Sequence, residues 1–133
     1  MIDGARVQDF AARQGRIAAR WGVSDCSIRL GDWTREAAGI DAAAPVRGTY
    51  DSALTCARLL RREGGLDRLV ARLMAGAGFC PTDEHDLPGV GAVGVIGLPG
   101  RLFHQWGASA TARTGSCSAG MASTGIAPPR WTR

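Results

Sequence analysis

The residues best suited to chemistry lie in one short segment, Trp-Gly-x-x-Asp-Cys-Ser at residues 21–27. Ser24 or Asp25 suits the N-cap of a helix running to about Ala38, which would put Cys26 in its first turn. A thiol there faces unpaired backbone N–H groups and the positive end of the helix dipole, and both stabilise a thiolate. Such a thiolate could attack an acyl carbon if a histidine from elsewhere served as base. Alternatively, Cys26 packs as a small apolar residue, as most free cysteines do.

The chain offers two histidines as a base, His85 and His104. His85 stands among acidic residues, and we expect it to be a solvated loop residue. Cys80 and His85 could form one edge of a zinc site, but two further ligands with suitable spacing are missing. The glycines of residues 89–94 lack the Gly-Lys-Ser/Thr of a phosphate-binding loop. We therefore expect no metal and no cofactor, and His104 is the candidate catalytic partner of Cys26.

The composition is typical of one globular domain. The 133 residues are 45% hydrophobic, and no apolar run approaches the roughly 20 residues that cross a bilayer. The net charge is +4, but the arginines alternate with acidic residues along the predicted helices, which favours solvated helix faces over a nucleic-acid surface. The N-terminus lacks the pattern of a secretory signal, so we expect synthesis in the cytoplasm. The four cysteines are widely spaced, and we expect them to be mostly reduced.

Hydrophobic periodicity predicts helices in the first half of the chain and strands in the second. We predict helices over about residues 3–20, 24–38, 51–62 and 66–76, with Thr49 or Asp51 as the cap of the third. We predict strands over 90–96, 101–106, 108–113 and 118–123, three or four of them forming a meander, and an edge strand in the proline-containing tail 127–133. The fold class is therefore α+β: a single domain over 1–133 whose helical half, 1–79, packs on a small antiparallel sheet from 90–133.

The four tryptophans divide into two groups. Trp21 and Trp33 flank or lie on the second predicted helix, and we expect them to be in the core or half-buried. Trp106 and Trp131 lie in the strand-rich half, where few large apolar residues are available to close a core. We therefore predict that Trp106 and Trp131 contribute to an interface, where tryptophan is enriched.

Residues 21–27 and the helix after them resemble the nucleophile segment of NlpC/P60-type cysteine peptidases, papain-like enzymes that cut peptide bonds in bacterial cell walls. The wider chain resembles an NlpC-related family of tailed phages, prophages and gene transfer agents, often encoded among tail genes. This resemblance covers about residues 16–100 and implies a papain-like arrangement. It is carried further by Gly-Ile-Asp at 39–41, Arg-Gly-Thr-Tyr at 47–50 and Leu-Leu-Arg-Arg-Glu-Gly-Gly-Leu at 59–66, with a weaker match at 130–131.

The chain departs from the peptidase pattern where the base is needed. NlpC-type enzymes usually have a Gly-Asp pair that opens the first core strand and a histidine that opens the next. The matching pair here is Gly91-Ala92, and the position of the base holds Arg101. His104 lies three residues further on and would point to the opposite face of a regular strand.

Two functions follow from the resemblance. In the first, the protein is a structural component of the distal tail, in the tip or hub region, that has lost catalysis and binds other tail proteins such as hub, distal-tail or fibre proteins. In the second, it is an active tail-associated peptidase that cuts peptidoglycan with Cys26 as nucleophile and His104 as base. Both place it in the virion tail after synthesis in the host bacterial cytoplasm, with no membrane span and no nucleic-acid partner. The missing base favours the first, and the intact segment 21–27 favours the second.

Overall fold

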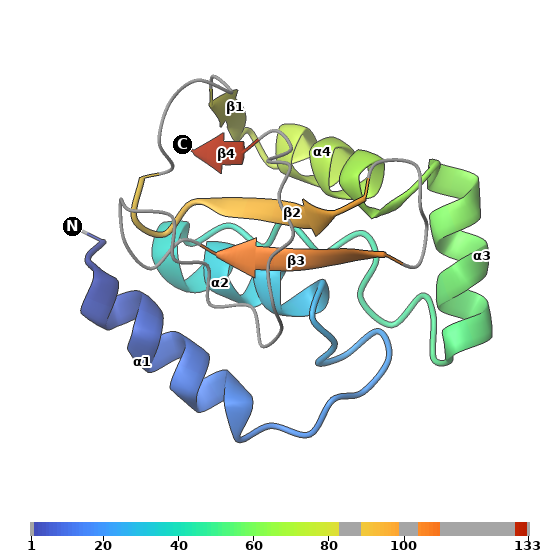
Figure 1. Cartoon of the computed structure of the whole chain (residues 1–133), viewed down its shortest axis with the longest axis horizontal. Coiled ribbons are helices and arrows are strands. Elements are labelled where there is room, and N and C mark those ends of the chain that lie inside the picture. The colour runs from blue at the N-terminus through green and yellow to red at the C-terminus, as the bar shows by residue number, and fades with distance from the viewer. Residues whose placement is uncertain (1, 83–88, 99–103, 110–129, 133) are drawn as a thin grey trace.

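The protein is described by a computed structural model that covers residues 2–82, 89–98, 104–109 and 130–132. These residues form four helices followed by strands of one antiparallel sheet, which confirms the α+β class (Figure 1). The helices are α1 (Gly4–Gly15), α2 (Ile28–Ala38), α3 (Ala53–Glu63) and α4 (Leu66–Gly76). The strands are β1 (Cys80–Thr82), β2 (Val93–Gly97), β3 (Gln105–Ser109) and β4 (Arg130–Thr132). Within the described residues, no helix is long and apolar enough to cross a membrane.

The sheet differs from the predicted meander. Its strand order is β1-β4-β2-β3, so the C-terminal strand lies between two others and is not at the edge. The two edge strands of the described sheet are β3 and β1, and β1 lies in a segment predicted as loop. The reason is that Pro128 and Pro129 precede β4 in the sequence, so its three residues keep the N–H donors that an interior strand needs. Strand β3 joins the end of the predicted strand 101–106 to the start of the predicted strand 108–113. Residues 101–103 and 110–113 and the predicted strand 118–123 lie outside the described residues.

The helix boundaries follow local capping chemistry. The first helix ends at Gly15, short of the predicted Arg20. Helix α2 ends at Gly39, which adopts the left-handed conformation expected of a C-terminal glycine, with φ of 73°. The N-cap of α3 is Ser52 and not Thr49 or Asp51, because Ser52 and Thr55 form a capping box. Helix α4 has the predicted bounds.

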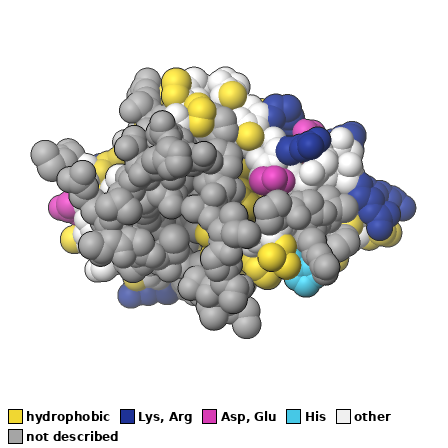
Figure 2. Space-filling view, turned by 45° about the horizontal axis from the view of Figure 1, so that its top comes forward, with side chains coloured by type: hydrophobic (Ala, Val, Ile, Leu, Met, Phe, Trp, Pro, Cys, Tyr) yellow, Lys and Arg dark blue, Asp and Glu magenta, His cyan; other side chains and the backbone are white. Residues whose placement is uncertain are grey.

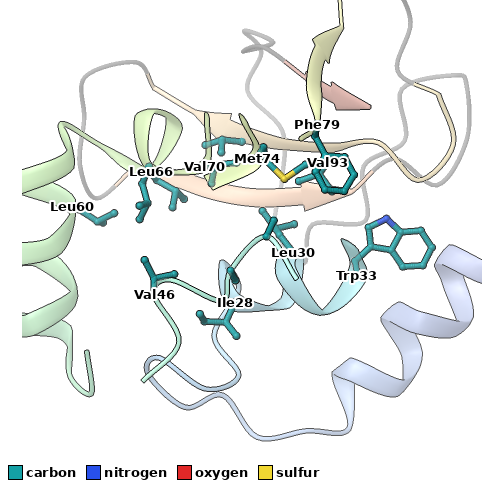
Figure 3. Close-up of a cluster of buried hydrophobic side chains, with 14 of the residues drawn as sticks. Ile28, Leu30, Trp33, Val46, Leu60, Leu66, Val70, Met74, Phe79 and Val93 are labelled. Atoms are coloured by element: carbon teal, nitrogen blue, oxygen red, sulfur yellow. The ribbon is translucent and has the colours of Figure 1, made fainter. Parts of the chain in front are cut away.

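One hydrophobic core joins all four helices to strand β2 (Figure 3). Trp33 is 1% exposed, and its indole Nε1 donates to the carbonyl of Gly91 at 2.8 Å. The Trp33 ring also packs against Phe10 of α1, with the ring centroids 5.1 Å apart. Helix α2 is thereby fixed between α1 and the approach to β2, and the segment just before α2 is the one that carries Cys26.

Candidate functional site

Cys26 does not lie in the first turn of a helix, as the sequence predicted. Helix α2 begins at Ile28 with Ser27 as its N-cap, so Cys26 is the residue before the cap, and it is exposed. Just before the helix, the Asp25 carboxylate accepts through Oδ1 from the backbone N–H groups of Ser27 and Ile28, both at 3.0 Å. The N-cap is therefore neither Ser24 nor Asp25, as predicted, but the Asp25 carboxylate binds N–H donors at the helix start on which the predicted thiolate stabilisation depended.

The second oxygen of Asp25 connects two loops. Its Oδ2 accepts from the Tyr50 hydroxyl at 2.6 Å and from the backbone N–H of Gly22 at 2.8 Å. Tyr50 is buried. Burial and the hydrogen bond to Asp25 raise the pKa of Tyr50, so the phenol remains a protonated donor. One carboxylate thus satisfies four donors from three parts of the chain.

The backbones of these two loops are also in direct contact. The Gly48 N–H donates to the carbonyl of Gly22 at 3.0 Å. A Cβ atom at Gly22 would lie 2.1 Å from the Tyr50 carbonyl oxygen, and its φ of 71° also favours glycine. Gly22, Asp25, Gly48 and Tyr50 therefore form one unit, here named the Asp25 junction. It joins two motifs, at 21–27 and 47–50, that residues 28–46 separate in the sequence.

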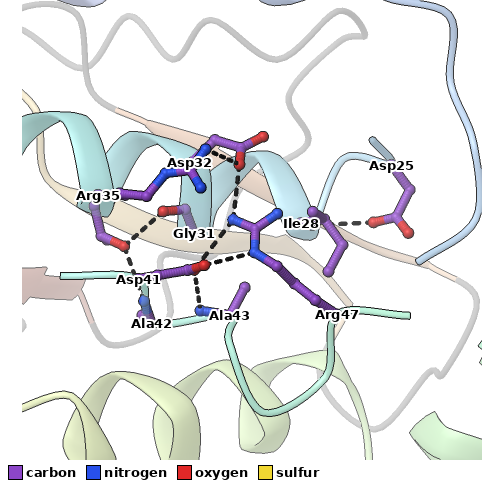
Figure 4. A network of polar contacts seen from close by, with 10 residues as sticks. Asp25, Ile28, Gly31, Asp32, Arg35, Asp41, Ala42, Ala43 and Arg47 are labelled. Atoms are coloured by element: carbon purple, nitrogen blue, oxygen red, sulfur yellow. Dashed lines mark hydrogen bonds and ion pairs between the residues drawn. The ribbon is translucent and has the colours of Figure 1, made fainter. Parts of the chain in front are cut away.

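An ion network fixes the second of these loops to helix α2 (Figure 4). Arg47 Nε lies 2.6 Å from Asp41 Oδ2, and its guanidinium also lies 2.7 Å from Asp32 Oδ1 on α2. The hydrogen bond to Asp41 raises the pKa of Arg47. Burial acts to raise the pKa of Asp41, but the hydrogen bond and charge of Arg47 outweigh it and lower that pKa. The polypeptide that supplies Tyr50 is thus held by charge at one end and by the Asp25 junction at the other.

Strand β3 faces this site with a glycine. A Cβ atom at Gly107 would lie 3.2 Å from the Cys26 carbonyl oxygen and 2.7 Å from Leu30 Cδ1. Gln105, two residues earlier on the same face, accepts from the Leu66 backbone N–H at 2.8 Å through its side-chain Oε1. This face of β3 therefore packs on the helices, and the position next to Cys26 carries no side chain.

His104 lies on the face of the chain opposite to Gln105 and Gly107. It is exposed and immediately precedes β3. Trp106, two residues further on and therefore on the same face of the chain, is 47% exposed. His104 and Gly107 are three positions apart along the extended chain, a distance of about 10 Å. The Cys26 sulfur has Ser27 Oγ as its partner at 3.9 Å, and among the described residues no hydrogen bond joins it to an imidazole. The structure does not bring Cys26 and His104 together in a hydrogen bond.

Cys56 is a neighbour that the sequence analysis did not single out. It is partly buried on α3, and burial, followed by the charges of Asp25 and Cys26, raises its pKa. This shift favours the protonated thiol. The sequence signal that could have identified Cys56 was its position in the helix that directly follows Tyr50. Cys26, Cys56 and Cys80 are all free thiols, as expected, and Cys117 lies outside the described residues.

The other residues named in the sequence analysis differ in exposure, and some lie outside the described part of the chain. Trp33 is buried as expected, but Trp21 is 45% exposed. The backbone of Trp131 lies in β4 opposite Val93 and Pro81, and its side chain is outside the description. His85 and Arg101 are outside the described residues too. In the described part of the chain, no group of three or more metal-ligating side chains comes together.

Comparison with known proteins adds one finding. A family model described as "Domain of unknown function (DUF6950)" matches residues 3–116, which include every helix, the Asp25 junction and strand β3. No curated protein and no solved structure matches the chain at a significant level.

Proposed function

Because the chain belongs to the family described as a domain of unknown function (DUF6950), its role has to be inferred from its own residues, and we propose that it is a structural component of a phage or gene-transfer-agent tail. In this proposal it is an NlpC-type, papain-like domain without catalysis, located at the tail tip or hub. The observation that supports the loss of catalysis is that, among the described residues, no imidazole forms a hydrogen bond with the Cys26 sulfur, and Gly107, which packs on the Cys26 backbone, brings no side chain there.

The arrangement around Cys26 supports a structural role for the whole segment 21–27. Asp25 accepts hydrogen bonds from the start of α2 and from the Tyr50 hydroxyl, and Gly22 is needed for the approach of the Tyr50 carbonyl. These residues stabilise the fold whether or not Cys26 reacts. The tail location is supported by the resemblance of residues 16–100 to tail-associated proteins, and its partners would be hub, distal-tail or fibre proteins.

The alternative function is an active peptidoglycan peptidase with Cys26 as nucleophile. One observation favours it: the Cys26 thiol is exposed, on a turn that Asp25 holds in place. His104 lies on the face of the chain opposite to Gly107, so the start of β3 would have to rearrange before His104 could act as the base.

Complementation separates the two functions. In a producing strain that lacks this gene, we expect no infectious or transducing particles, and we expect Cys26→Ser to restore them fully. The protein should be detectable in purified tails, and it should not digest purified peptidoglycan. Digestion that disappears in Cys26→Ser, together with failure of that variant to complement, would establish the peptidase instead. Full complementation by an empty vector would reject both functions.

A further inference from the structure

Helix α3 has an outer face whose charges are not compensated. Arg58 and Arg61 are exposed, and neither forms an ion pair or a side-chain hydrogen bond with any described residue. Around the Asp25 junction, by contrast, Arg47 is bound by two carboxylates. Unpaired arginines on a helix that is otherwise well capped are available for a partner.

The same face carries an exposed apolar side chain. Leu54 is 60% exposed, the highest value among the large hydrophobic residues of the described structure. Leu54, Arg58 and Arg61 are spaced at i, i+4 and i+7, so they follow one another along one side of the helix. The opposite side is buried through Leu59 and Leu60. Helix α3 thus presents a mixed stripe, here named the α3 stripe, that nothing else described in the chain covers.

Charge is concentrated in this part of the molecule. Residues 53–76, which form α3 and α4, contain five arginines and two acidic residues, a net charge of +3 out of +4 for the whole chain. One of the acidic residues, Glu63, is already held by Arg72 at 2.8 Å. Figure 1 shows α3 at one end of the molecule, packed beside α4, and Figure 2 shows arginine side chains gathered over that end. This charge favours an acidic partner at this end of the molecule.

We propose that the α3 stripe docks onto an acidic surface of a partner protein, with Arg58 and Arg61 binding carboxylates and Leu54 filling an apolar contact. The inference rests on the proposed assembly role, for which it names the docking surface. A protein fits better than a nucleic acid for two reasons. The stripe is about 10 Å long, which leaves room for few phosphate contacts. Leu54 would have no apolar counterpart on a phosphate backbone, and the stripe offers no aromatic ring for base stacking.

The test uses the full chain and a fluorescein-labelled peptide of six glutamates and two leucines, with binding followed by anisotropy at low salt. Arg58→Glu/Arg61→Glu should weaken binding by about tenfold or more, because it replaces attraction by like-charge repulsion. Arg16→Glu/Arg20→Glu is the matched control: both arginines are exposed and without an ion pair to a described residue, and each double change lowers the net charge from +4 to 0. It should change binding less than about twofold. Leu54→Ser should weaken binding by about threefold.

Three outcomes would overturn the proposal. The first is no measurable binding by the unchanged chain. The second is an equal loss in both double variants, which would reduce the effect to net charge. The third is tighter binding of a twelve-nucleotide single-stranded DNA than of the peptide, lost in Arg58→Glu/Arg61→Glu, which would identify a nucleic-acid surface. Unchanged circular dichroism shows that the variants fold.

Particle formation separates this inference from the proposed function. If Arg58→Glu/Arg61→Glu loses peptide binding yet complements the deletion strain fully, the docking surface is rejected and the assembly role stands. If the unchanged chain is absent from purified tails but binds the peptide through the α3 stripe, the assembly role is rejected and the acidic-partner surface stands.

Discussion

The two sides of the candidate site, the Asp25 junction and strand β3, differ in the side chains that they bring to it. On one side, the Asp25 junction satisfies four hydrogen-bond donors with a single carboxylate and brings two distant loops together. On the other side, β3 presents Gly107 toward Cys26 and leaves His104 exposed. The comparison teaches that Gly22 and Asp25 of segment 21–27 have structural contacts that do not depend on any reaction of Cys26. An intact Trp-Gly-x-x-Asp-Cys-Ser motif is therefore weaker evidence for catalysis than a side chain on the facing strand.

The largest effect is expected from Asp25→Ala. The change leaves the buried Tyr50 hydroxyl and three backbone N–H groups without their acceptor, so we expect the free energy of unfolding to fall by about 3 kcal/mol or more. Cys26→Ser, one residue away and exposed, should change it by less than about 0.5 kcal/mol. Urea unfolding monitored by tryptophan fluorescence measures both. Similar small losses of unfolding free energy in the two variants would mean that the hydrogen bonds of the Asp25 junction do not stabilise the segment.

The second prediction contrasts the glycines of the two sides. Gly22→Ala places a Cβ atom against the Tyr50 carbonyl and requires an unfavourable φ, and we expect a loss of about 2–4 kcal/mol. Gly107→Ala meets mainly the flexible end of Leu30, so we expect a loss of about 1 kcal/mol. Thermal and urea unfolding of both variants provide the measurement. If Gly107→Ala is the more damaging change, β3 and not the Asp25 junction is the rigid side of the site.

The parts of the fold that the sequence predicted are those governed by local chemistry. Gly39 ends α2 in the left-handed conformation because a glycine after a periodic apolar pattern is the common helix end. The bounds of α4 follow from the same periodicity between glycines. The start of α2 was placed less well, because its N-cap is Ser27 and not Ser24 or Asp25.

What the sequence did not predict depends on contacts between distant residues. The hydrogen bond between Tyr50 and Asp25 spans 25 positions, and no local pattern specifies it. The place of β4 between β1 and β2 is set by sheet pairing, to which a three-residue strand contributes little sequence signal. That Gly107 lies next to Cys26 follows from the packing of β3 on α2, which fixes which face of the strand turns inward.

The third prediction concerns how the β3 side is attached. Helix α4 follows Gly65, which has no side chain for capping, and the Gln105 side chain accepts from the Leu66 and Asp67 N–H groups instead. We expect Gln105→Ala to cost about 1–1.5 kcal/mol, the usual cost of a lost N-terminal cap. Trp106→Ala, on the exposed face, should cost less than about 1 kcal/mol in the isolated chain. A larger effect of Trp106→Ala on unfolding would show that the outer face of β3 is part of the core.

The smallest effect tests the ion network by pH. Arg47 lowers the pKa of Asp41 in the folded chain, so this interaction stabilises the fold above the unfolded pKa of about 4 and is lost as the pH falls through the folded value. We expect the difference in unfolding free energy between the unchanged chain and Asp41→Asn to be below about 1 kcal/mol at pH 6, because the pair is partly exposed, and to shrink toward pH 3. Urea unfolding at both pH values measures it, with Asp9→Asn, at the exposed pair with Arg13, as the control. A difference that grows toward pH 3 would mean that Arg47 does not hold the loop of Tyr50 by charge, and the Asp25 junction would then position that loop alone.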